Sequence, residues 1–126
     1  MKLIHTNRHR ESFRILGKTR SLQAAVMTLP PGESTGDPDN EHPDSEQWLL
    51  VLSGTGRAKV GRRTAALKEG SLLVIEKGEK HQVKNIGRKQ SLVTLNFYAP
   101  PAYKAGAKPR VAGIRSAVRA LTNLTA

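Results

Sequence analysis

The sequence predicts an all-β domain, because short apolar runs recur between glycine-containing turns over most of its length. No helix long enough to join two parallel strands is predicted between these runs. Short strands at this spacing are typical of an antiparallel sandwich or barrel. The predicted strands are Leu22–Leu29, Gln47–Leu52, Gly56–Val60, Thr64–Leu67, Ser71–Ile75, His81–Asn85 and Leu92–Phe97.

Each predicted strand ends at a residue type that favours a turn, since glycine and proline interrupt extended backbone. The turns, in chain order, are Pro30-Pro31-Gly32, Gly54-Thr55-Gly56, Gly61-Arg62-Arg63, Glu69-Gly70, Lys77-Gly78 and Gly87. The barrel is therefore expected to occupy residues 21–98 as a single domain.

Two flanks differ from this central pattern. Residues 1–20 are polar and basic, with one short strand expected at Phe13–Leu16 that joins a sheet edge. Residues 99–126 form a basic tail with five Lys or Arg and no acid. In this tail Val111, Ile114, Val118 and Leu121 recur at helical spacing, which predicts a short helix.

Charge and composition exclude several classes of function. The 126 residues contain no cysteine, which excludes disulfides, thiolate catalysis and iron–sulfur clusters. The net charge is +11, but the Lys and Arg residues form no block and six of the ten acids lie between Glu33 and Glu46. This distribution favours a solvated basic surface over a nucleic-acid site. With no apolar run of membrane-spanning length and no signal-like start, we expect a cytoplasmic protein without membrane partners.

Two segments carry the polar residues of a candidate site. The first contains Asn40, His42, Gln47 and Gly54, and the second contains Gly70, Gly78, His81 and Asn85. In order and spacing they resemble the two motifs of the cupin superfamily, His-x-His…Glu…Gly and Gly…Pro-x-Gly…His…Asn. The resemblance covers residues 20–98 and implies a small, single-domain jelly-roll β-barrel of the cupin 2 type.

The spacing has a physical reason of its own. Asn40 and His42 are two residues apart, so on a strand they face the same side. Gln47 is expected to face inward on the next strand, and His81 to enter from a different hairpin. Imidazoles and amide oxygens that converge in this way can hold a divalent transition metal such as Fe, Mn, Zn, Ni or Cu. The predicted metal ligands are His42, His81, Gln47 and Asn40.

The departures from the family pattern leave the function open. The resemblance implies three His and one carboxylate, whereas this chain offers two His and two neutral amides, so the iron pattern of the cupin dioxygenases is incomplete. One reading is a metal-dependent dioxygenase or isomerase, with no catalytic residue assigned. The alternative is a non-catalytic, metal-free barrel that binds or senses a small molecule. In either case the residues expected to line the ligand are Leu49, Val51, Val83 and Asn85. A one-residue change of register would turn Glu46 inward in place of Gln47.

The strand Gln47–Leu52 also predicts a contact surface. Trp48, Leu50 and Leu52 alternate with the inward residues and therefore form an apolar row on the outside. Such rows are rarely left in contact with water on a small protein. We expect a homodimer through this row, with cover by the chain's own Val111–Leu121 segment as the alternative.

Overall fold

The structure is a computed structural model that describes residues 1–6, 12–35, 43–104 and 111–112. These residues form strands, turns and extended segments, and none of them is helical. The strands are β1 (Phe13–Lys18), β2 (Gln23–Leu29), β3 (Ser34–Thr35), β4 (Glu46–Ser53), β5 (Gly56–Val60), β6 (Arg63–Leu67), β7 (Leu72–Ile75), β8 (His81–Asn85), β9 (Leu92–Ala99) and β10 (Val111–Ala112). The described part of the chain accordingly has no helix that could span a membrane.

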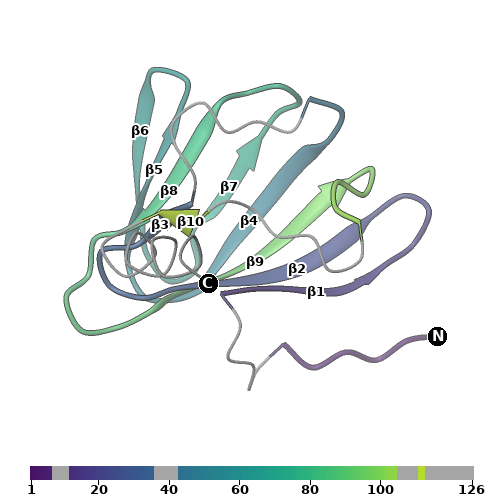
Figure 1. Cartoon of the computed structure of the whole chain (residues 1–126), viewed down its shortest axis with the longest axis horizontal. Coiled ribbons are helices and arrows are strands. Elements are labelled where there is room, and N and C mark those ends of the chain that lie inside the picture. Colours follow the sequence, from purple (N-terminus) through teal and green to yellow (C-terminus); the bar gives the residue numbers. More distant parts are fainter. Residues whose placement is uncertain (7–11, 36–42, 105–110, 113–126) are drawn as a thin grey trace, which may run out of the picture.

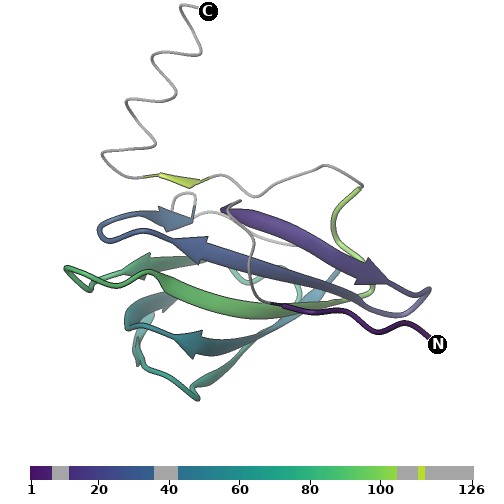
Figure 2. The ribbon, with the colours of Figure 1, turned by 90° about the horizontal axis from the view of Figure 1, so that it is seen from below.

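The strands form two antiparallel sheets of five strands each (Figures 1 and 2). The order is β1-β2-β9-β4-β7 in the first sheet, sheet A, and β10-β3-β8-β5-β6 in the second, sheet B. From β2 to β5, and again from β6 to β10, each step along the chain crosses from one sheet to the other. This alternation is the jelly-roll arrangement, and it confirms the predicted fold class.

All seven predicted strands are present. The boundaries differ by one or two residues, because β4 begins at Glu46 and β9 continues to Ala99. The expected edge strand at Phe13–Leu16 is β1, which pairs with β2 at the edge of sheet A. The sequence did not predict β3 or β10, which have two residues each.

The predicted helix in the tail is wrong at its first turn. Val111 and Ala112 form β10, which pairs with Thr35 and Ser34 of β3. Backbone pairing with an edge strand has outweighed the helical spacing of the apolar residues there, as tertiary context commonly does. The rest of the predicted helix lies outside the described residues.

The core lies between the two sheets and follows the pleat of the strands. On β4, Gln47, Leu49 and Val51 are buried, whereas Trp48 is 41% exposed and Leu50 is half-buried. The predicted inward and outward sets are therefore confirmed. The buried cluster consists of Met27, Leu29, Leu49, Val51, Ala58, Leu67, Val83 and Leu92. Each large aliphatic side chain in it contributes about 1.5–3 kcal/mol by leaving water.

The turn between β4 and β5 depends on the absence of a side chain at Gly54. Its φ is +89°, and a Cβ there would lie 2.4 Å from the Ser91 carbonyl oxygen and 2.9 Å from Leu92 Cα. Both neighbours are backbone atoms that cannot swing away. The close approach packs this turn against the start of β9, at the end of the sandwich opposite to the start of β4.

We predict that Gly54→Ala destabilises the fold far more than Gly70→Ala. Gly70 has nearly the same φ, +87°, but a Cβ added there would meet nothing within 4 Å, so this variant reports the backbone strain alone. That strain costs about 1–2 kcal/mol, and the clash at Gly54 adds about 1–3 kcal/mol. Urea unfolding of both variants measures the difference. Equal losses of unfolding free energy would show that the turn tolerates a methyl group.

Candidate functional site

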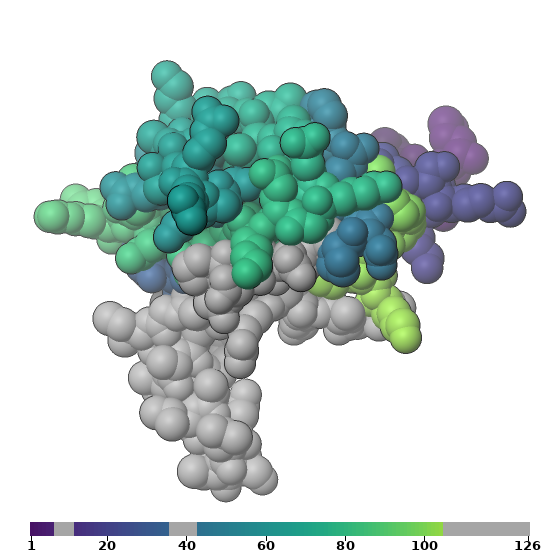
Figure 3. Space-filling model, turned by 90° about the horizontal axis from the view of Figure 1, so that it is seen from above, coloured from purple at the N-terminus to yellow at the C-terminus, as the bar shows by residue number. Residues whose placement is uncertain are grey.

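The two predicted metal ligands that the structure describes, Gln47 and His81, lie at one end of the space between the sheets. Gln47 is the second residue of β4, and its pairing partners are Tyr98 on β9 and Ile75 on β7. His81 is the first residue of β8 and pairs with Val60, the last residue of β5. Since β4 runs into β5 through a tight turn, the start of β4 and the end of β5 lie at the same end. Figure 3 looks onto this end, where the β5–β6 turn and residues 76–80 lie near the start of β4.

Gln47 is held in place by a short chain of neutral polar groups. Its Nε2 donates to Asn96 Oδ1 at 2.9 Å, and Asn96 Nδ2 donates to Thr94 Oγ1 at 3.0 Å. All three side chains are buried on the inner face of sheet A. The amide oxygen of Gln47, Oε1, is buried without a hydrogen-bond donor from the described part of the chain. An orphaned acceptor of this kind costs about 1–3 kcal/mol, so it marks a place where a bound group would be stabilised.

The alternation of buried and exposed residues along β4 shows which of Glu46 and Gln47 faces inward. Gln47 is 4% exposed and faces the interior, whereas Glu46 is half-buried and belongs to the opposite face. Asn96 and Thr94 were not singled out from the sequence. They share the parity of Leu92 in Leu92–Phe97, so alternation along that strand was the signal that places them inside.

His81 is buried and its tautomer is determined by one contact. Nδ1 lies 3.0 Å from the carbonyl oxygen of Glu79. A carbonyl only accepts, so in the neutral ring Nδ1 carries the proton and Nε2 is the acceptor nitrogen. Burial lowers the pKa of His81, and the Glu79 carbonyl and carboxylate oppose that effect only in part. The ring is therefore neutral at pH 7, the form that can coordinate a metal or accept a hydrogen bond.

The four residues expected to line a ligand lie deeper in the sandwich. Leu49, Val51 and Val83 are 0–1% exposed and belong to the core cluster. Asn85 is fully buried and bonds only to backbone groups in the contacts seen: Nδ2 donates to Leu29 O and Gln90 O, and Oδ1 accepts from Gly87 N. These contacts tie two turns to β8. The predicted contact of this set with a ligand stays a prediction.

Two of the four predicted metal ligands lie outside the described residues, namely Asn40 and His42. Within residues 1–6, 12–35, 43–104 and 111–112, no group of three or more His, Cys, Asp or Glu side chains is placed to hold a metal ion. The described donors are thus Gln47 Oε1 and the His81 ring. They are neutral, which suits a metal site that is completed by other ligands or a hydrogen-bonding site for a molecule.

An aromatic cluster closes one side of this end. Tyr103 packs against Phe13 and Tyr98, with ring centroids 5.0 Å apart in both pairs. The side-chain amide of Gln23 holds the segment in place: Nε2 donates to Tyr103 O, and Oε1 accepts from the backbone N–H groups of Ala102 and Tyr103. Burial raises the pKa of Tyr103 to about 12 and that of Tyr98 well above its usual value, so both phenols stay neutral. The sequence did not reveal this contact across 80 residues.

A side cavity of about 340 Å³ opens between the edge strands β6 and β7. Its apolar lining includes Ala58, Val60 and Leu73, and its polar lining includes Arg63 and Glu79. Val60 is the pairing partner of His81, so the cavity reaches the neighbourhood of the candidate site from the side. Its size falls within the range of small-molecule sites.

Comparisons with known proteins agree with this architecture. The family model described as "Cupin domain" matches residues 25–98. The solved structure of BH2720 from Bacillus halodurans has a TM-score of 0.73 at 29% identity, covering 83% of this chain and 81% of that one. KdgF from a Halomonas species has a TM-score of 0.64 at 16% identity, covering 71% and 77%. A predicted oxalate decarboxylase from Thermotoga maritima has a TM-score of 0.63 at 23% identity, covering 71% of this chain and 79% of that one. No curated protein sequence matches the chain.

We predict that folding stability falls as the pH drops below 6.5, in a way that depends on His81. The unfolded histidine has its ordinary pKa of 6.5 and the folded one a lower value. Between these two values the unfolded state binds more protons, so the free energy of unfolding decreases with decreasing pH. His81→Gln should flatten this dependence in urea unfolding at several pH values. Identical pH profiles for wild type and His81→Gln would contradict the prediction.

Proposed function

The chain belongs to the cupin domain family, and from this premise we propose that it binds a small molecule between its sheets, at the end where Gln47 and His81 lie. The observation that carries the proposal is Gln47 Oε1, a buried acceptor without a donor from the described residues. The other amide atom, Nε2, is committed to Asn96, which orients the oxygen. A donor group or a cation at this point removes the desolvation cost of the oxygen.

The polar groups at this end of the described interior support a neutral or weakly polar ligand. Gln47, Asn96, Thr94 and the neutral His81 ring provide donors and acceptors without formal charge. The side cavity adds apolar wall from Val60 and Leu73. A pocket with apolar walls and a few oriented polar groups is the usual design of a small-molecule site.

The finer proposal is that a divalent transition metal takes part, held by His42 and His81 with help from Gln47 and Asn40. His81 supports it, because donation from Nδ1 to a backbone carbonyl is the arrangement that orients metal-binding histidines. A bound metal supplies Lewis-acid chemistry. The incomplete carboxylate set weighs against an iron dioxygenase. A metal-free binding or sensing barrel is the second candidate, favoured by the bond that already uses the Gln47 amide to anchor Asn96.

We predict that untagged protein, purified without chelator or added metal, carries about one divalent transition metal ion per chain, the stoichiometry of a single site. Elemental analysis of the wild type and of a His42→Ala/His81→Ala variant measures it. The double variant should lose the metal and keep its β-sheet circular dichroism. His5→Ala, at an exposed position, is the control and should keep the metal. Metal content that is unchanged in the double variant would remove His42 and His81 from the site, and a metal-free wild type would favour the second candidate.

We further predict that Gln47→Glu tightens metal binding by about tenfold or more, a gain of about 1.4 kcal/mol, because a carboxylate is a charged oxygen donor at the same position. Competition with a chromophoric chelator measures the affinity. Glu46→Gln is the matched control, since Glu46 is on the opposite face of β4 and should leave the affinity unchanged. If Gln47→Glu folds normally and binds metal no better, Gln47 does not touch the metal and its role is to orient a ligand.

A further inference from the structure

The outer face of sheet B has positive charges on neighbouring strands. On β5, Arg57 and Lys59 alternate with the buried Ala58 and point outward. On β8, the exposed Lys84 is the direct pairing partner of Arg57. Arg62 is exposed in the turn that joins β5 to β6. We call Arg57, Lys59, Arg62 and Lys84 the basic face.

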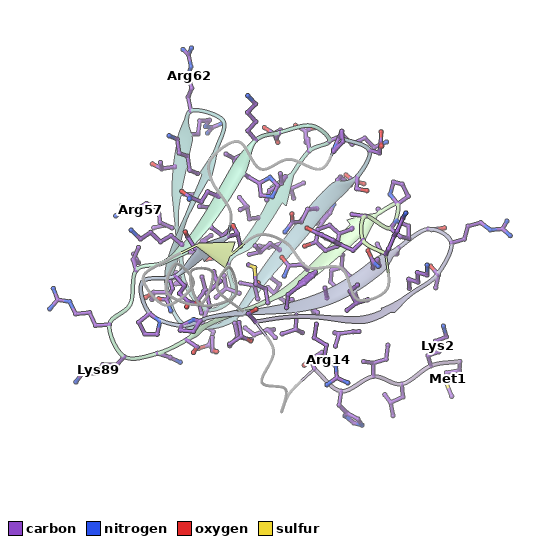
Figure 4. The ribbon with its side chains drawn as sticks, viewed as in Figure 1. Met1, Lys2, Arg14, Arg57, Arg62 and Lys89 are labelled. Atoms are coloured by element: carbon purple, nitrogen blue, oxygen red, sulfur yellow. The ribbon has the colours of Figure 1, made fainter. Side chains whose placement is uncertain are left out.

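The fold gathers these residues from a sequence in which Lys and Arg are spread along the chain. The hairpin from Gly56 to Lys68 has five basic residues and no acid, and the pleat turns alternate side chains to one side. Figure 4 shows Arg57 and Arg62 projecting from the side of the molecule where sheet B lies, well apart from Arg14 on β1. Positive charge that is spread in the sequence is therefore concentrated over β5 and β8 in the fold.

The basic face has no neutralising carboxylate among the described residues. None of its four cations makes an ion pair in that part of the chain. The acids that follow β7, Glu76 and Glu79, line the side cavity together with Arg63, on the inner side of the hairpin. Like charges directly opposite each other on adjacent strands are destabilising. The pair of Arg57 and Lys84 is therefore a cost to the free protein that a bound anion would remove.

We propose that the basic face binds the phosphate backbone of a nucleic-acid duplex without reading its sequence. Arg57 and Arg62 are five residues apart, at most about 17 Å of extended strand. Over that length a duplex has about ten phosphate charges. Each of the four cations therefore has phosphate groups within reach, and no special match of spacing is needed.

The other outward side chains of sheet B fit phosphate contacts better than base contacts. Arg57 pairs with Ala66 and Lys59 with Thr64 on β6, and Gln82 lies opposite Lys59 on β8. Thr and Gln side chains donate hydrogen bonds to phosphate oxygens. The outward positions of β5, β6 and β8 hold no aromatic residue, which disfavours single strands because these bind by stacking. They also hold no large apolar residue, which a membrane surface would need for insertion.

Fluorescence anisotropy with a labelled DNA duplex of about 20 base pairs, between about 50 and 200 mM salt, tests the proposal. Four phosphate contacts predict a dissociation constant of about 1–100 μM, and a slope of about −3.6 for the logarithm of the association constant against the logarithm of the salt concentration. Arg57→Gln/Lys84→Gln should reduce the slope to about −1.8, because two contacts are lost. Two duplexes of unrelated sequence should bind alike.

Arg14→Gln/Lys18→Gln is the matched control. Both residues are exposed on β1 of sheet A, and the variant loses the same net charge. It should keep the slope of the wild type. Circular dichroism should be unchanged in both double variants, since Arg57→Gln/Lys84→Gln removes a like-charge pair and not a core contact.

Absence of duplex binding at about 50 mM salt would overturn the proposal. An equal loss of slope in the two double variants would do the same, because net charge alone would then account for the binding. Vesicles of phosphatidylcholine and phosphatidylserine test the alternative partner. If Arg57→Gln/Lys84→Gln loses affinity for the vesicles and not for the duplex, the face binds lipid headgroups and the proposal is wrong. These results do not depend on the proposed function, since Lys84 and His81 lie on opposite faces of β8.

Discussion

The pleat of β4 is the constraint on which both surfaces of this protein depend. The strand hydrogen-bonds to β9 on one side and to β7 on the other, so its register cannot slip without breaking two ladders. A slip of one residue would bring Trp48 into the core and expose Leu49 and Val51. With the register held, Gln47 faces the interior beside Tyr98 and Trp48 faces outward beside Phe97. One strand thus provides both the candidate ligand contact, Gln47, and the exposed apolar side chain of Trp48.

The inner face of sheet A contains buried polar side chains, one of which has an unsatisfied acceptor atom. A core built only for stability would fill the inward positions of β9 with aliphatic side chains, as it does at Leu92. Instead Thr94 and Asn96 are fully buried, and the hydrogen bonds of Asn96 orient Gln47. A chain of this kind leaves one oxygen, Gln47 Oε1, with nothing to accept from the described residues. Buried polar networks that end in an unsatisfied atom are expected at sites that bind something.

The alternation of apolar residues and the glycine-containing turns predicted the strands, because both signals are local in the sequence. The alternation in Gln47–Leu52 was enough to separate the inward from the outward side chains, and the glycine turns placed the strand ends within two residues. Two-residue strands such as β3 have no period to detect, and β10 showed a helical pattern instead. The partners of the site residues were equally hidden. Alternation places Asn96 inside, but only the pairing of β4 with β9 brings it to Gln47, and only the fold brings Tyr103 to Gln23.

The outer faces of the two sheets differ in charge. Like charges directly opposite each other on adjacent strands are destabilising, yet sheet B carries Arg57 beside Lys84. That arrangement keeps the outer face of sheet B solvated and opposes stacking of one copy on another through it. On the outer side of sheet A the exposed residues Trp48, Leu72 and Val74 are apolar, and the last two lie on the edge strand β7, where an edge is usually protected by charge. The two outer faces therefore differ in kind: basic residues keep one of them in water, and the other exposes apolar side chains.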